Sequence, residues 1–213
     1  MKQIAILLYP GLTPLDAIGP YHVLSQFPGY EATFVALQKG EISDGKGFTL
    51  IATKSIEDYQ SAEILVIPGG LPAITMARTG GPLIDWIQKI HPTTEWTISI
   101  CTGALMLGAA GILENKEATT HWYSHSELSN YGAKPVDARV VRSGKILTSA
   151  GVSAGIDMSL VLAEEIFGKE FAQTMQLDME YDPAPHLDAG HPRTAPEKVT
   201  SKLRKLFDSA LAD

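Results

Sequence analysis

Short apolar runs alternate with helical patterns along most of the chain. The apolar runs are rich in β-branched residues and predict strands buried on both faces, at residues 4–8, 32–37, 64–67 and 97–100. Apolar residues at helical spacing predict helices over residues 15–26, 82–90 and 102–110. This alternation indicates βαβ crossovers, and therefore an α/β fold with a mostly parallel sheet and helices on both sides.

The last third of the chain carries a different set of patterns. Residues 139–142 and 146–149, joined by Ser143-Gly144-Lys145, predict a β-hairpin. Helices are expected over residues 154–167, from 169 towards 177, and over the amphipathic stretch 196–212. Residues 181–192 are too rich in proline and turn formers for regular structure, and we expect a loop that lies on the surface or covers a partner subunit. We expect residues 1–213 to form a single domain.

Three segments far apart in the sequence are expected to meet at one edge of the sheet. Asp16 follows the first strand, Gly69-Gly70 follows the strand at 64–67, and Cys101 follows the strand at 97–100. Sites in open α/β sheets form outside the carboxyl ends of the strands. The pattern therefore predicts one crevice that contains all three segments.

Cys101 stands between a β-rich run and a helical run of small residues. This layout is typical of a nucleophile elbow, in which a tight strand-to-helix turn lifts one side chain out of the sheet edge. The adjacent helix N-terminus is expected to favour the thiolate, which is the nucleophilic form. The alternative is that Cys101 is a small buried hydrophobic residue.

Asp16 is an acid in otherwise apolar surroundings. It serves either as a first-turn carboxylate that stabilises its helix or as a partner of Cys101. Burial and a neighbouring thiolate would raise the Asp16 pKa, whereas the helix dipole would lower it. A protonated carboxyl that faces a thiolate makes an acid–nucleophile pair, and the two groups titrate as a unit.

Other candidate residues carry weaker signals. Gly69 and Gly70 let backbone N–H groups approach developing negative charge, although the alternative is a plain turn. His121 is the histidine best placed to approach Cys101 and is also compatible with a structural role, and Asp157 is expected to cap or brace the long helix. The histidines lack metal-ligand spacing, so we expect neither a metal nor a cofactor.

Composition limits the classes of protein to consider. With 213 residues, 45% of them hydrophobic, the chain is long enough for a full core. A net charge of −7 argues against a nucleic-acid surface, and we expect neither a membrane span nor a cleaved signal. A single cysteine excludes an intrachain disulfide framework, which fits a reducing compartment, and we expect the protein in the cytoplasm.

Taken together, these motifs resemble those of a known family. The sequence is similar to the PfpI/ThiJ branch of the class I glutamine amidotransferase-like superfamily, and within it to the bacterial isonitrile hydratases. The motifs that carry this resemblance are Leu15-Asp16, Gly19-Pro20, Pro68-Gly69-Gly70, Cys101-Thr102-Gly103, Thr120-His121-Trp122, the segment from Ala150 to Asp157, and Met179-Glu180-Tyr181-Asp182-Pro183. The resemblance implies a flavodoxin-like three-layer sandwich and a homodimer.

The resemblance also implies an activity, the hydration of a small-molecule isonitrile to an N-substituted formamide. Cys101 would add to the isonitrile carbon as a thiolate, Asp16 would protonate that carbon, and Thr102 would orient water towards the resulting thioimidate. Backbone N–H groups near Gly70 and Thr102 would stabilise developing charge. Two alternatives stay open: a glyoxalase- or deglycase-like enzyme, whose relatives carry Glu at the place of Asp16, and a non-catalytic binding protein or cysteine redox sensor. Proteases of the branch carry His at the place of Thr102, and AraC-type regulators add a helix-turn-helix region, so neither is expected.

Overall fold

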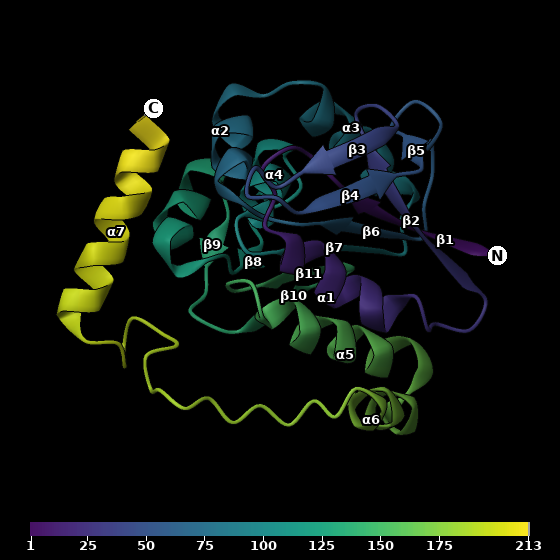
Figure 1. Cartoon of the computed structure of the whole chain (residues 1–213). Coiled ribbons are helices and arrows are strands. Elements are labelled where there is room, and N and C mark those ends of the chain that lie inside the picture. The colour runs from purple at the N-terminus through teal and green to yellow at the C-terminus, as the bar shows by residue number, and fades with distance from the viewer. Residues whose placement is uncertain (213) are drawn as a thin grey trace.

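A seven-stranded sheet forms the centre of the protein (Figure 1). The computed structural model describes residues 1–212. All neighbouring strands of this sheet are parallel except β10 and β11, which form the predicted hairpin. In spatial order the strands are β10 (Val140–Ser143), β11 (Ile146–Ser149), β7 (Trp96–Ile100), β6 (Ile64–Ile67), β1 (Lys2–Leu7), β2 (Tyr30–Ala36) and β5 (Lys54–Ser55).

Helices cover both faces of the sheet, which gives three layers and confirms the flavodoxin-like α/β architecture (Figure 1). One face carries α1 (Pro14–Leu24) and α5 (Ala154–Phe167), with α6 (Lys169–Asp178) packed on α5. The other face carries α2 (Leu71–Thr79), α3 (Pro82–Ile90) and α4 (Gly103–Ala109). Crossovers on opposite faces are expected because β1 leads outward to β2, whereas β6 leads in the other direction to β7.

Burial follows the predicted pattern in three of the four apolar runs. Residues 4–8, 64–67 and 97–100 are all buried. The expectation that residues 32–37 are buried on both faces is wrong, because Leu37 is exposed and residues 32–34 are half-buried. The reason is topological: β5 pairs only with Val35 and Ala36, so the rest of β2 lies at the open edge of the sheet.

Several short elements were not anticipated from the pattern. They are the hairpin β3 (Gly40–Ser43) and β4 (Thr49–Ala52), the short strands β5 and β9 (Lys134–Pro135), the 3₁₀ helices η1 (His91–Thr93) and η2 (Trp122–Tyr131), and helix α2. A further short strand, β8 (Glu117–Ala118), lies just before His121. Each of these strands has only two to four residues, too short to show a periodicity. Among residues 1–212, no helix combines the length and the apolarity that crossing a bilayer requires.

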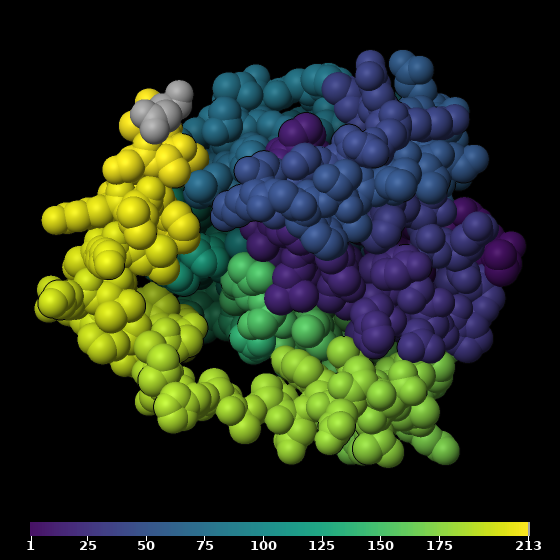
Figure 2. Space-filling model, in the orientation of Figure 1, coloured from purple at the N-terminus to yellow at the C-terminus, as the bar shows by residue number. Residues whose placement is uncertain are grey.

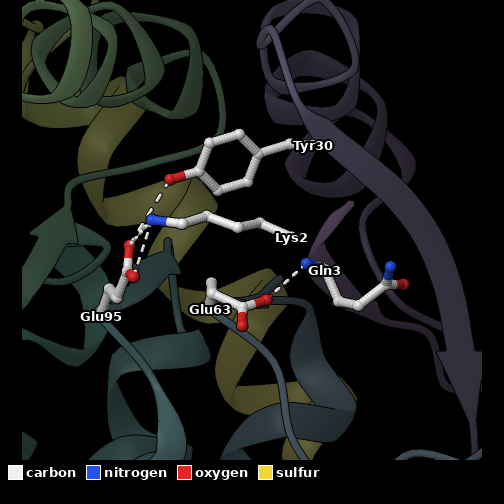
Figure 3. Close-up of polar contacts among 5 residues, drawn as sticks. All are labelled: Lys2, Gln3, Tyr30, Glu63 and Glu95. Carbon is white, nitrogen blue, oxygen red and sulfur yellow. Dashed lines mark hydrogen bonds and ion pairs between the residues drawn. The ribbon is translucent and has the colours of Figure 1, made fainter.

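Polar contacts join the amino ends of the central strands at one edge of the sheet (Figure 3). Lys2 Nζ lies 2.7 Å from Glu95 Oε2, and the Tyr30 hydroxyl donates to the same oxygen at 3.5 Å. The Glu63 carboxylate accepts the backbone N–H of Gln3. Lys2 and Glu95 are both 47% exposed, so water and salt screen their ion pair, which contributes little to stability. These contacts connect the amino ends of the strands, and the carboxyl ends lie at the opposite edge of the sheet.

The C-terminal arm, defined here as residues 182–212, leaves the body after α6 and returns on the other side (Figure 1). Figure 2 shows an opening between the extended part of the arm and the body. The arm ends in α7 (Glu197–Ala212), in which no described residue is buried. It is attached by the ion pair of Arg193 with Asp137 and by a 2.6 Å hydrogen bond from the Tyr123 hydroxyl to Asp208.

Candidate active site

Cys101 occupies the predicted nucleophile elbow between β7 and α4. Its φ of 55° lies in the left-handed region, which is strained for a residue with a side chain and typical of functional turns. Three hydrogen bonds fix this conformation: the Cys101 N–H donates to the carbonyls of Ser149 and Ala150, and the Thr120 hydroxyl donates to the Cys101 carbonyl at 2.7 Å. The side chain is only 5% exposed. The turn therefore holds the thiol in one orientation just below the protein surface.

Asp16 lies in the first turn of α1, and its side chain is fully buried. Oδ2 accepts the backbone N–H of Gly69 at 2.9 Å, so the carboxyl reaches away from its own helix and does not cap it. Oδ1 has no hydrogen-bond partner among the described residues. An unpartnered buried carboxyl oxygen lowers the stability of the fold, so its presence needs an explanation. A reactive role for Asp16 provides one.

The Asp16 and Cys101 side chains influence each other's protonation. Burial raises the pKa of Asp16 to about 7, against the lowering effects of the Gly69 N–H and of Cys101. Burial, followed by the charge of Asp16, raises the pKa of the Cys101 thiol to about 12. The Thr102 N–H at the start of α4 lowers the Cys101 pKa, as expected, but desolvation outweighs this effect. The expected effect of burial on Asp16 is confirmed, whereas the expectation that Cys101 also raises the Asp16 pKa is wrong, because hydrogen bonding to Cys101 lowers it.

Two glycines allow the three segments of the site to pack closely. A Cβ atom on Gly69 would lie 2.6 Å from the backbone N of Thr102 and 2.8 Å from Cys101 Cβ. A Cβ atom on Gly103 would collide with the backbone carbonyl of Ile67. Real side-chain atoms do not approach this closely, so only glycine lets the end of β6 touch the elbow.

Thr102 joins the elbow to the diglycine turn. The Gly70 N–H donates to the Thr102 hydroxyl oxygen at 2.8 Å, and that hydroxyl donates to the Gly70 carbonyl at 2.8 Å. The hydroxyl proton is thereby used, and one lone pair of the oxygen remains. Because the N–H of Gly69 is bound to Asp16, both N–H groups of the diglycine are engaged within the protein, which leaves the Thr102 N–H of the donors predicted near Gly70 and Thr102.

Other backbone N–H groups face the sulfur. Hydrogen bonding by the N–H groups of Val152 and Thr102 lowers the Cys101 pKa, against the effects of burial and of Asp16. Residue 152 was missed as a site residue because a backbone N–H leaves no mark on the amino-acid sequence. Its segment was noticed only as part of the stretch from Ala150 to Asp157.

His121 lies beside the elbow, and no hydrogen bond among residues 1–212 joins it to Cys101. Its Nδ1 accepts the N–H of Tyr123 at 3.4 Å, which leaves the proton on Nε2. A Cβ atom on Gly151 would lie 2.7 Å from His121 Cδ2, so the ring rests against the loop that carries Val152. Burial lowers the pKa of His121 to about 4, which keeps the ring neutral at physiological pH.

A cavity of about 750 Å³ opens next to these residues. Its wall includes Thr120, His121 and Val152 from the site, Leu15 from α1, and Arg193 and Arg204 from the C-terminal arm. Pockets of this volume accept small organic ligands. Cys101 and Asp16 are not among its lining residues, so the cavity borders the elbow through its neighbours, and the arm forms the opposite side.

Asp157 braces the start of α5, as expected. Its Oδ2 accepts from Arg139 Nε at 2.8 Å and from the Tyr181 hydroxyl at 3.0 Å. Arg139 also donates to the Ser153 hydroxyl at 3.2 Å. These contacts hold the loop that presents the Val152 N–H, and they tie the base of the arm to it.

Comparison with known proteins agrees with this geometry. The model of the DJ-1/PfpI family matches residues 2–165. The isonitrile hydratase of Pseudomonas putida is 40% identical over 206 residues, which cover 95% of this chain and 89% of that protein. Deglycase TK1284 of Thermococcus kodakarensis is 28% identical over 149 residues, covering 69% of this chain and 89% of its own.

A solved structure extends the similarity to the whole chain. The crystal structure of a ThiJ/PfpI family protein from Pseudomonas syringae superimposes with a TM-score of 0.89 and 34% sequence identity. It covers 99% of this chain and 89% of its own. The match therefore extends beyond residues 2–165 and includes the C-terminal arm.

Proposed function

The chain belongs to the DJ-1/PfpI family, and we propose that it hydrates isonitriles, R–N≡C, to N-substituted formamides. The observation that carries the proposal is the buried pair of Asp16 and Cys101. The pair places a carboxyl with a pKa near 7 and a free oxygen beside a nucleophile. An isonitrile carbon accepts a nucleophile and a proton at the same atom, which is the chemistry such a pair can supply.

The first step forms a covalent thioimidate. Loss of one proton from the pair leaves a single negative charge, and the reactive tautomer carries it on sulfur while Asp16 holds the proton. The Cys101 sulfur bonds to the isonitrile carbon as Asp16 protonates that carbon, which gives R–N=CH–S–Cys101 and an ionised Asp16. The Val152 and Thr102 N–H groups would stabilise the thiolate before attack, since they face the sulfur.

The second stage restores the enzyme. Water adds across the C=N bond, with its oxygen bonding to carbon and one proton passing to nitrogen. The remaining lone pair of the Thr102 hydroxyl accepts a hydrogen bond from this water. Asp16 then takes the hydroxyl proton as the C–S bond breaks. The products are R–NH–CHO, the Cys101 thiolate and a protonated Asp16, as at the start.

The alternatives fit the geometry less well. The family resemblance implies Glu at the place of Asp16 in deglycase-like enzymes, whereas the shorter Asp16 side chain here is bound to the Gly69 N–H. A redox sensor needs a thiol that oxidants can reach, whereas Cys101 is only 5% exposed and is paired with a buried acid that such a sensor does not need. The homodimer and the cytoplasmic location remain predictions.

Turnover of cyclohexyl isonitrile tests the proposal, with the formamide measured by chromatography. We expect product from the wild type and none from Cys101→Ala or Asp16→Asn, because the first lacks the nucleophile and the second lacks the proton. Intact mass after acid quench should show the isonitrile mass added to Cys101. A matched Asp188→Asn variant, in the exposed arm, should keep full activity. Product from folded Cys101→Ala would refute the covalent scheme.

A further inference from the structure

The cavity beside the site is bordered by positive charge at the side made by the C-terminal arm. Arg139, Arg193 and Arg204 line it, and Asp137 is the acidic residue among its lining residues. Arg139 is paired with Asp157, and Arg193 with Asp137. Arg204 has no carboxylate partner among residues 1–212. The cavity therefore holds an excess of positive charge, although the whole chain carries a net charge of −7.

Aromatic rings connect Arg204 to the reactive centre. The Arg204 guanidinium lies 5.2 Å from the centroid of the Trp122 ring, and the Trp122 and His121 ring centroids are 5.5 Å apart. His121 in turn rests against Gly151, next to the residue whose N–H faces the Cys101 sulfur. The cavity thus borders the elbow through His121 and Val152 at one end and Arg204 at the other, so a ligand that lies along this wall would have one end beside the Cys101 turn and the other at Arg204.

We propose that this cavity selects isonitriles that carry a carboxylate at the end opposite the isonitrile group. The inference rests on the proposed function and names its class of substrate. The guanidinium stacked on Trp122 offers a planar set of N–H donors with no internal acceptor, which matches a carboxylate. The Trp122 and His121 rings between the two ends, tilted by 39° to each other, offer apolar contact to an aryl ring. A neutral isonitrile would leave the Arg204 charge without a partner in the bound state.

The experiment compares two isonitriles of nearly equal shape, 4-isocyanobenzoate and 4-isocyanobenzamide. We expect the wild type to prefer the carboxylate in kcat/KM by about 10- to 100-fold, the range for hydrogen bonds to a charged group. Arg204→Met keeps the aliphatic stem over Trp122 but removes the charge, and should abolish most of this preference through KM. Lys205→Met is the matched control. Lys205 occupies the next position of α7 and lies on the wall of a different hollow. This substitution also removes a charge and should leave kcat/KM unchanged for both substrates.

Binding of the products measures the preference for a carboxylate without turnover. Calorimetric titration with 4-formamidobenzoate and 4-formamidobenzamide should show tighter binding of the carboxylate, and Arg204→Met should abolish the difference. Equal binding and equal turnover of the two members of each pair would overturn the inference, as would equal effects of the two variants. If neither isonitrile yields a formamide, the proposed activity fails, and the titrations alone decide whether Arg204 selects a carboxylate.

Discussion

The buried Asp16 carboxyl should make this protein less stable as the pH rises. The Asp16 pKa is about 7 in the folded state against an ordinary value of 3.8, so the folded state binds more protons than the unfolded state between these values. The resulting stabilisation is fully present below pH 3.8 and is lost as the pH rises through about 7. At 1.36 kcal/mol for each pKa unit, ionised Asp16 costs about 4 kcal/mol above pH 7.

Asp16→Asn isolates this cost, because the amide has nearly the same shape and does not ionise. Its Oδ1 can still accept the Gly69 N–H, whereas the new NH₂ group takes the place of the unpartnered oxygen. Any penalty for that NH₂ group is independent of pH. The variant should therefore gain stability relative to the wild type by about 2–3 kcal/mol between pH 5 and pH 8.5.

Urea unfolding followed by tryptophan fluorescence at pH 5 and pH 8.5 measures the difference. The wild type, Asp16→Asn and the exposed control Asp188→Asn are compared at both values. Groups such as His91 and His121, whose pKa burial lowers to about 4, contribute equally to each protein and cancel in the comparison. A stability difference that stays constant or shrinks with rising pH would refute the assignment of a raised pKa to Asp16.

Three further predictions concern the site. The value of kcat/KM should rise with pH through an apparent pKa near 7, as the Asp16–Cys101 pair loses its first proton, and a flat profile from pH 5 to 9 would contradict this. Gly69→Ala should lower stability by about 2 kcal/mol or more and abolish turnover, because the added methyl group collides with the elbow; calorimetric melting and an activity assay check both. Thr102→Val, which loses both hydrogen bonds to Gly70, should cost about 1–3 kcal/mol in urea unfolding, whereas Thr102→Ser should stay within 1 kcal/mol of the wild type.

The sheet and the elbow could be predicted because their signals are local. The strand at 64–67 is a continuous apolar run that ends at Pro68-Gly69, and the strand at 97–100 consists of β-branched and small residues directly before the thiol. The convergence of Asp16, Gly69 and Cys101 then follows from a general rule of parallel sheets. The net shift of the Cys101 pKa could not be predicted, because it depends on how deeply the thiol is buried. Sequence indicates that a helix begins after the thiol, but not how much solvent the neighbouring segments exclude.

The contacts around the cavity could not be predicted, since they join distant segments through groups without a sequence signature. Val152 contacts the site through its backbone N–H, a group that every residue except proline has. In the sequence, Arg204 is one of several positive charges on an amphipathic helix, and only the fold places it over Trp122. Likewise Thr120 gains its role from a single hydrogen bond to the Cys101 carbonyl.

The C-terminal arm separates two tasks that many enzymes combine in one set of loops. The reacting groups stand at the edge of the sheet, within residues 2–165, which the family model matches. Arg193 and Arg204 stand on a segment beyond it, attached by a few surface contacts. Mutations in the arm can thus alter which molecules enter without disturbing the strained elbow. On this architecture, new substrate preferences can evolve while the chemistry remains under separate selection.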